Sequence, residues 1–571
     1  MTRFTSLTRR KRPWMIGACA LVLVVSSGAA VASAVQSTHR VSTGSALLAR
    51  AFGALVPSTN GRAATDPACA PDTTVAINSG PVCGILQDGD YQWLGIPYAA
   101  PPVGPLRWKP PQPPSPWTTT LPATAFGSQC VQVLAPSSVA GSENCLFINV
   151  VRPAGPQPAS GLPVLVHIHG GGFIGGSGNV DYSLLANSGR EVVVSMNYRL
   201  NIFGFLADRA LGEDSGDYGL EDQQAALRWV KQNVRAFGGN AGNVTIFGES
   251  AGGSSVCDQI ASPTAHGLFE KAFSVSGEYS TLFGSPNQVL NFQDCKSTPP
   301  TQAVADRAGE SFVAAVGCTS AAEVADCLRR VPAAAVLAAA GGGFTASGTG
   351  TISPTLNARV LPLSLRQSLV RGTANRVRVI AGTNRDENLA GTATTPDQYR
   401  ALVDQQFGAY APAVLQEYPL ERFYSPFIAF RTVAADAYTV CPAIVTEQLL
   451  AKRMPAWEYE LDHGDAPPSY LPPNLPNGSY HVGAYFLFPG FLGTTNLDAN
   501  NLVLQQQEVA DLTTFARTGN PTAKFTPFWP EFNDTHEVMS WQPGGDSEVM
   551  TTAQISLNHH CDFWNAISPK P

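Results

Sequence analysis

Residues 244–253, with the sequence VTIFGESAGG, constrain the fold of this chain more than any other stretch. Residues 244–247 are typical of a strand, Ser250 follows between small residues, and the spacing predicts a short helix over about 251–260. This G-x-S-x-G pattern is typical of a sharp strand-to-helix turn that holds a serine hydroxyl above a sheet. A serine becomes a nucleophile only beside a base. A glycine-rich turn with an incidental serine is the alternative, but the flanking strand and small-residue helix favour a nucleophile.

Strands and helices alternate along the chain around this turn. Apolar runs predict buried strands over residues 145–151, 163–169, 192–198, 272–276, 376–382 and 457–461. Residues 221–237 carry apolar side chains at helical spacing, and the glycines at 238–239 end that helix. Strands that alternate with helices form a mostly parallel sheet. The sequence therefore predicts an α/β fold with a large, mostly parallel central sheet flanked by helices.

Two regions depart from this alternation. Residues 82–86 are predicted as a strand, and the proline-rich residues 95–108 as an ordered surface loop, because proline fits neither a helix interior nor a central strand. Residues 281–376 carry helical pieces, with a break near Pro332. We interpret that region as a helical insertion over the active site.

The N-terminus is typical of a secretory signal peptide. Residues 9–12 are basic, residues 15–25 are apolar, and residues 32–34 (ASA) match an A-x-A cleavage site. The apolar run is shorter than the ~20 residues of a membrane span. We therefore expect a signal peptide over 1–34, a flexible leader over 35–71 and one folded domain over 72–571. The protein should be secreted, without stable membrane insertion.

The cysteines agree with secretion. The chain has 11, and removal of Cys19 with the signal peptide leaves an even number, which a secreted protein can keep as disulfides. Short separations suggest three local pairs, Cys69–Cys83, Cys130–Cys145 and Cys318–Cys327. No C-x-x-C spacing indicates a metal site.

A glycine run forms a second chemical element. Residues 170–172 directly follow the predicted strand at 163–169. Backbone N–H groups without side chains around them can donate to an oxyanion. A flexible linker would not follow a buried strand, so the oxyanion interpretation is favoured. His167 and His169 share one strand face, but no third ligand is evident, so we expect no metal there.

The serine needs a base, and the base needs an acid that orients it. In chains with this turn the acid and then the histidine follow the serine, each on a loop after a strand. Asp386 or Glu387 follows one predicted strand, and His463 or His481 follows the next. The order fits, but spacing alone leaves both choices open.

Short motifs between residues 74 and 565 match one known family. They are GIPYA at 95–99, ENCLFIN at 143–149, HGGGF at 169–173, NYR at 197–199, FGGN at 237–240 and GESAGG at 248–253. Together they resemble the type-B carboxylesterase family, which includes the cholinesterases and fungal lipases. The resemblance implies the α/β-hydrolase fold, no cofactor, and a serine hydrolase of carboxylic esters.

The resemblance also chooses between the open alternatives. The family acid is the glutamate of the loop that matches residues 384–387, which implies Glu387 rather than Asp386. The family histidine opens a segment like residues 481–488, which implies His481 rather than His463. Ser250 would attack the ester carbonyl, His481 would act as general base and acid, and water would then hydrolyse the acyl-enzyme.

The oxyanion donors implied by the family are the backbone N–H groups of Gly171, Gly172 and Ala251. The family disulfides match Cys130–Cys145, Cys318–Cys327 and Cys441–Cys561, which leaves Cys257–Cys295 as a further pair beside Cys69–Cys83.

The chain departs from the family at two points. Asn144 stands where the family usually has an acidic residue, and no aromatic residue lies between Cys130 and Cys145, where the cholinesterases have a cation-binding tryptophan. A choline ester is therefore disfavoured as substrate. A transacylase or thioesterase could use the same triad, whereas a non-catalytic adhesion module of this fold would lack the serine.

The net charge of the chain narrows the range of binding partners that we expect. The formal net charge is −7, and no long basic run occurs after residue 12, so nucleic acid is not expected. A small-molecule or lipid ester remains as the expected partner, and the sequence leaves the oligomeric state open.

Overall fold

The computed structural model describes residues 68–135, 138–277, 295, 299–320, 323–341, 353–387, 393–463 and 498–568. The predicted signal peptide (1–34) and most of the predicted leader (35–71) lie outside these residues. Cys69 and Ala70, which were predicted within the leader, are bonded to the fold, because Cys69 pairs with Cys83 and the N–H of Ala70 donates to the carbonyl of Gly84.

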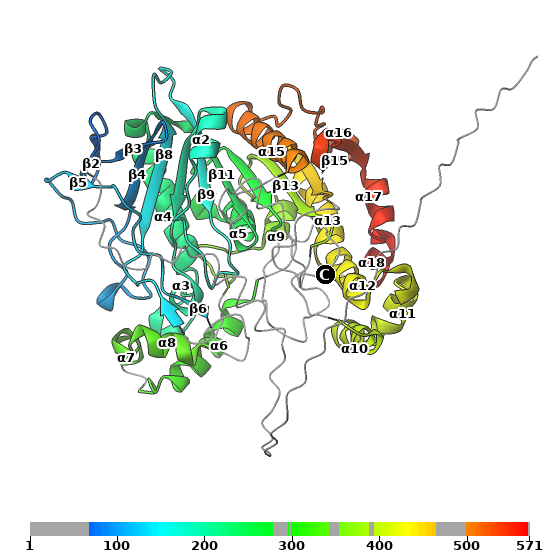
Figure 1. The fold of residues 1–571 in the computed structure, drawn as a ribbon. Coiled ribbons are helices and arrows are strands. Elements are labelled where there is room, and N and C mark those ends of the chain that lie inside the picture. Colours follow the sequence, from blue (N-terminus) through cyan, green and yellow to red (C-terminus); the bar gives the residue numbers. More distant parts are fainter. Residues whose placement is uncertain are drawn as a thin grey trace, which may run out of the picture. The chain divides into compact units, whose positions relative to one another are not determined.

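The described residues form an 11-stranded central sheet with the spatial order β16-β15-β14-β13-β12-β11-β9-β10-β8-β4-β3 (Figure 1). Its strands are β3 (Ile85–Gln87), β4 (Asp90–Pro97), β8 (Phe147–Pro153), β9 (Leu162–Ile168), β10 (Val192–Met196), β11 (Gly239–Glu249), β12 (Lys271–Val275), β13 (Arg378–Asn384), β14 (Ala456–Leu461), β15 (Glu537–Trp541) and β16 (Glu548–Thr551). Neighbours from β10 to β15 are parallel, and the remaining neighbours are antiparallel. The sheet is therefore mostly parallel, as predicted.

In the described part of the chain, two smaller sheets accompany the central one. The first contains β1 (Val75–Ile77), β2 (Gly80–Cys83) and β5 (Leu121–Pro122), and the second contains β6 (Gln132–Ala135) and β7 (Ser138–Ala140).

Helices connect the strands and extend beyond them. They are α2 (Ser183–Gly189), α3 (Asn201–Phe205), α4 (Tyr218–Asn233), α5 (Ala251–Ala261), α6 (Gln302–Ala315), α7 (Val324–Arg330), α8 (Ala333–Ala339), α9 (Leu365–Arg371), α10 (Pro396–Phe407), α11 (Ala411–Glu417), α12 (Pro426–Ala435), α13 (Cys441–Ala451), α15 (Ala499–Thr518), α16 (Phe532–Thr535), α17 (Thr552–Asn558) and α18 (Cys561–Ile567). The break predicted near Pro332 separates α7 from α8, because Pro332 is the N-cap of α8.

The central strands bury both of their faces. Val164 and Val166 of β9 join a hydrophobic cluster that includes side chains of α4, α5 and α9. The intervening Leu165 joins a second cluster that includes side chains of α2 and α15. Side chains alternate between the two faces of a strand, so a strand covered on both sides needs a continuous apolar run. This requirement explains why these strands were visible in the sequence.

The prediction of a surface loop over residues 95–108 was wrong at both ends. β4 continues to Pro97, because Gly95 adopts a φ of +75° at an irregularity in the pairing of β4 with β8. Such a bulge lets a strand resume after an unpaired residue. At the other end Trp108 is only 1% exposed and stacks on Phe203. The segment is thus part of the core at each end.

The strand predicted over residues 82–86 is also wrong as a single element. It divides at Gly84 into β2 and β3, which belong to different sheets. A Cβ atom at Gly84 would lie 2.2 Å from the carbonyl oxygen of Gln92, so only glycine fits the crossing point.

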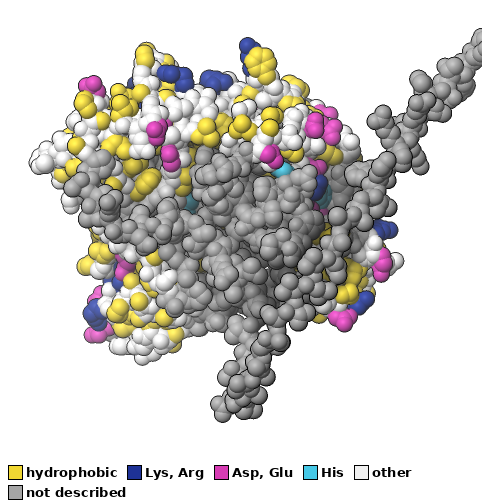
Figure 2. Space-filling model, viewed as in Figure 1, with side chains coloured by type: hydrophobic (Ala, Val, Ile, Leu, Met, Phe, Trp, Pro, Cys, Tyr) yellow, Lys and Arg dark blue, Asp and Glu magenta, His cyan; other side chains and the backbone are white. Residues whose placement is uncertain are grey.

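The described part of the chain contains one helical run, Pro426–Ala451, that is long and apolar enough to cross a membrane by length and composition. Within the fold 72% of its apolar window is buried, as in a core helix. On the face shown in Figure 2, the described acidic and basic side chains lie scattered among hydrophobic and neutral ones.

Candidate active site

Ser250 lies in the sharp turn between β11 and α5. Its backbone has φ 57° and ψ −124°, a conformation that residues with a side chain rarely adopt. The N–H of Ser250 donates to the carbonyl of Val275 on β12 (2.9 Å), and its own carbonyl accepts from the N–H of Ser254 (2.9 Å). The neighbouring strand and the following helix therefore hold the serine in this unfavourable conformation.

Glycine is required beside the serine because the turn sits on the end of β9. A Cβ atom at Gly252 would lie 2.1 Å from the carbonyl oxygen of Ile168, and one at Gly248 would lie 2.5 Å from the same atom. Any side chain at either position would push the turn away from the sheet.

The predicted oxyanion run meets the serine turn directly. A Cβ atom at Gly170 would lie 2.5 Å from the carbonyl oxygen of Glu249 and 3.3 Å from Cβ of Ser250. Gly171 and Gly172 follow with φ values of +106° and +62°. Ala251 is the first residue of α5, so its N–H has no acceptor within the helix. The structure thus brings the glycine run, Ser250 and the start of α5 together.

The two candidate acids have different surroundings. Asp386 is 19% exposed in its side chain, and its Oδ2 lies 2.7 Å from a guanidinium nitrogen of Arg385. Glu387 is fully buried, and its Oε1 accepts from the side-chain amide of Asn384 (2.9 Å). A buried carboxylate beyond the end of β13 suits an orienting role better than an ion-paired, partly exposed one. The sequence did not reveal the bond from Asn384.

His481 lies outside the described residues, so its contacts are not described. Each downstream histidine that the structure describes contacts another group. His463 places Nε2 against Oδ1 of Asn501, and the ring of His536 lies 5.3 Å from that of Phe532. The last two, His559 and His560, contact carboxylates.

His167 and His169 are buried under the candidate site. The ring of His167 lies 5.2 Å from each of the rings of Tyr182 and Phe247, and the ring of His169 stacks on Tyr198. Burial lowers the pKa of both imidazoles, to about 4 for His169. Neutral rings among aromatic neighbours indicate a structural role. No group of three metal-ligating side chains occurs among the residues that the structure describes.

Among the described residues the structure contains five disulfides, which are the pairs expected from the sequence. They are Cys69–Cys83, Cys130–Cys145, Cys257–Cys295, Cys318–Cys327 and Cys441–Cys561.

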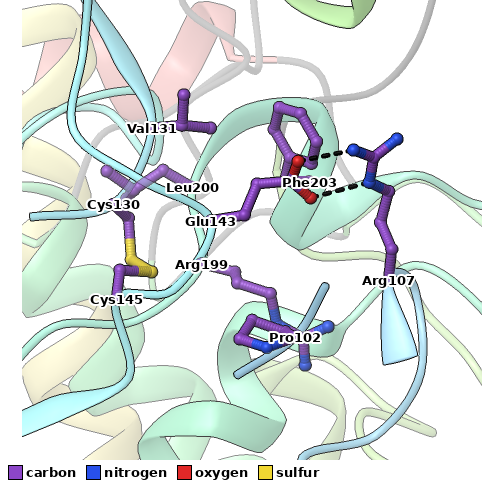
Figure 3. Close-up of a pocket in the computed structure, with 9 residues that line it drawn as sticks. All are labelled: Pro102, Arg107, Cys130, Val131, Glu143, Cys145, Arg199, Leu200 and Phe203. Carbon is purple, nitrogen blue, oxygen red and sulfur yellow. Dashed lines mark hydrogen bonds and ion pairs between the residues drawn. A yellow bond between two sulfur atoms is a disulfide. The ribbon is translucent and has the colours of Figure 1, made fainter. Parts of the chain in front are cut away.

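A small cavity beside Cys130–Cys145 is structural (Figure 3). Arg107 donates to both carboxylate oxygens of Glu143, at 2.5 and 2.6 Å, and to the carbonyl oxygens of Leu328 and Val331. The two bonds to carbonyl oxygens fasten the proline-rich segment to the C-terminal end of α7. The cavity holds about 10 Å³, which is about the space for one water and too little for an ester.

Comparisons with known proteins agree with this geometry. The model of the carboxylesterase family matches residues 71–564. The para-nitrobenzyl esterase of Bacillus subtilis is 32% identical over 490 residues, which cover 81% of this chain and 94% of that protein. The fumonisin B1 esterase of Sphingopyxis macrogoltabida is 33% identical, over 81% of this chain and 85% of that protein.

Solved structures give the same result. A thermophilic PNB esterase superposes with a TM-score of 0.71 at 29% identity and covers 86% of this chain and 99% of its own. A second PNB esterase has a TM-score of 0.69 at 30% identity, with 85% and 99% covered. The chain therefore belongs to the carboxylesterase family, has its α/β-hydrolase fold, and is a type-B serine hydrolase of carboxylic esters.

Proposed function

We propose that Ser250 is the nucleophile of this esterase, that His481 is its general base and acid, and that Glu387 orients His481. His481 removes the hydroxyl proton while Oγ of Ser250 bonds to the ester carbonyl carbon. The protonated imidazole then gives that proton to the leaving alcohol oxygen as the carbon–oxygen bond breaks. Water attacks the acyl-enzyme by the same route and releases the acid.

The observation that carries this proposal is the contact between the serine turn and the glycine run. Gly170 packs against Ser250, so the two glycines that follow it begin beside the nucleophile. The proposed oxyanion hole consists of the N–H groups of Gly171, Gly172 and Ala251. Preorganised donors of this kind stabilise the tetrahedral intermediate. In comparable enzymes, removal of one donor raises the activation free energy by about 3–4 kcal/mol.

The assignments of Glu387 as the acid and of His481 as the base rest on different observations. Glu387 is buried and held by Asn384, whereas Asp386 is held by Arg385. The other downstream histidines that the structure describes (His463, His536, His559 and His560) each contact another group. His481 retains the support of the family pattern and of its position after β14.

We further propose that the enzyme is secreted, on the signal-peptide pattern at 1–34 and on five disulfides, which an oxidising compartment favours. N-terminal sequencing of protein from the culture medium tests this, with a start at Val35 expected. A small carboxylic ester is the proposed substrate, without stable membrane insertion and without nucleic acid as a partner.

Replacement of Ser250 tests the nucleophile. Ser250→Ala should lower the hydrolysis of p-nitrophenyl acetate by about 10³-fold or more, because no other group supplies the attacking oxygen. Ser254→Ala, one helical turn further along α5, is the matched control and should retain activity. A series of p-nitrophenyl esters from acetate to palmitate then defines the acyl preference of the unmodified enzyme. Full activity in Ser250→Ala would refute the assignment.

A further inference from the structure

A groove of about 640 Å³ lies at the opposite end of the sheet from Ser250. Lys271 and Arg378 begin β12 and β13 and are paired in the register of these parallel strands. Ser250, by contrast, follows the carboxyl end of β11, which is parallel to β12. The groove is therefore separate from the candidate active site, and its size lies within the usual range of small-molecule sites.

The groove is strongly cationic in a chain whose net charge is −7. Five basic side chains line it together with the single carboxylate of Glu270, and they are Lys271, Arg376, Arg378, Arg453 and Arg517. Glu270 is already engaged, because its Oε1 lies 2.6 Å from Nζ of Lys231 and its Oε2 accepts from the N–H of Val244. Within the described part of the chain, no ion pair is formed by any of the five lining cations.

The positive charge of Lys271 is recessed into the protein, whereas the four arginines at the groove are exposed. Lys271 is only 6% exposed, and its ammonium contacts the amide oxygen of Asn243 rather than a carboxylate. Burial, opposed by Glu270 and reinforced by Arg378, lowers the pKa of Lys271 to about 8. A buried ammonium without an anionic partner is destabilising. A bound anion would offset this cost and raise the pKa of Lys271 again.

Two of the four arginines, Arg378 and Arg453, are held in place by backbone carbonyls. Arg378 donates to the carbonyl of Gly519 (3.1 Å), and Arg453 donates through Nε to the carbonyl of Leu369 (2.7 Å). Hydrogen bonds to carbonyl oxygens hold a guanidinium in place, but they supply no negative charge to neutralise it. Guanidinium groups bind both carboxylate and phosphate oxygens in a two-pronged geometry. A phosphate offers more oxygens and more negative charge to several cations than a single carboxylate does.

We propose that this groove binds a soluble anion that carries two or more linked phosphate groups. Several phosphates are required because the cations come from separate segments, at the start of β12, around the start of β13, after α13 and at the end of α15. A soluble ligand is required because a flat membrane surface cannot reach the recessed Lys271.

Calorimetric titration of the full enzyme tests the proposal, with tripolyphosphate, pyrophosphate, inorganic phosphate and sulfate compared at equal ionic strength. We expect saturable binding that strengthens from phosphate to pyrophosphate to tripolyphosphate and weakens with added salt. Vesicles of phosphatidylcholine with phosphatidic acid should not bind. Absence of saturable binding, or binding to the vesicles alone, would overturn the proposal.

Charge-removing variants assign the binding to the groove. The double variant Arg376→Gln/Arg378→Gln should weaken tripolyphosphate binding by about tenfold or more, because it removes two uncompensated cations. Arg376→Gln alone, at an exposed position, should give a smaller loss and guards against misfolding of the double variant. Arg422→Gln, in the 3-10 turn Leu420–Arg422, is the matched control and should bind as the unmodified enzyme does. Equal losses in the control and the double variant would refute the location.

Discussion

At the scale of single residues, the clearest distinction is between two adjacent carboxylates. Glu387 is fully buried and Asp386 is ion-paired with Arg385. The orienting acid stabilises the imidazolium that forms during catalysis. Glu387→Gln should therefore lower kcat of p-nitrophenyl acetate hydrolysis by ~10²–10⁴-fold with little change in KM, whereas Asp386→Asn should cost much less. If Asp386→Asn proved the more damaged variant, the assignment would be reversed.

A second residue, Glu191, makes the stability of the fold depend on pH. It directly precedes β10, is fully buried, and has no hydrogen bond to either carboxylate oxygen among the described residues. Burial raises its pKa from 4.5 to about 8, although the charge of Arg517 opposes the shift. The folded state thus retains a proton that the unfolded state loses. The resulting stabilisation is complete below pH 4.5 and is lost as the pH rises to about 8.

Glu191→Gln should remove this dependence. Urea unfolding should show a gain on the order of 1–3 kcal/mol at pH 8.5, where the wild-type side chain is charged, and little change at pH 5. Glu213→Gln, at an exposed position, should change neither value appreciably. A gain that is equal at both pH values would contradict the role of the buried charge.

At the scale of elements, the disulfides differ in how much chain they enclose. Cys441–Cys561 joins the start of α13 to α18 across 120 residues, whereas Cys318–Cys327 spans 9. In the chain-entropy model these loops contribute about 5 and about 2.6 kcal/mol. Replacing both cysteines of the long pair with alanine should therefore lower Tm more than the same change in the short pair. A larger loss from the short pair would show that local packing, not loop closure, controls the effect.

The elements also show where the sequence was informative. β9 to β14 were predicted because both faces are buried, which requires long apolar runs. β16 was not predicted, because an edge strand with half-exposed and exposed side chains carries no such run. The end of β4, from Gly95 to Pro97, was predicted as loop because proline does not fit a central strand, whereas a bulge at Gly95 allows the strand to continue. Such irregularities depend on contacts between distant segments.

At the scale of the whole molecule, the direction of the strands was predictable and their order was not. Parallel strands bring their carboxyl ends to one edge of the sheet, so Ser250 after β11 and Glu387 after β13 lie at the same edge. That β9 lies between β10 and β11 is decided by pairing of segments far apart in sequence. The cationic groove has the same origin, because its side chains come from four distant segments. The choice of Glu387 and His481 came from the family resemblance and not from spacing.

The measurement that tests the central claim most directly is covalent labelling of the native enzyme with a fluorophosphonate, followed by peptide mass spectrometry. The probe reacts only with a serine that a neighbouring base activates. We expect one adduct, on Ser250, formed in step with the loss of esterase activity and absent from Ser250→Ala. An adduct on another serine, or complete inactivation without modification of Ser250, would contradict the account.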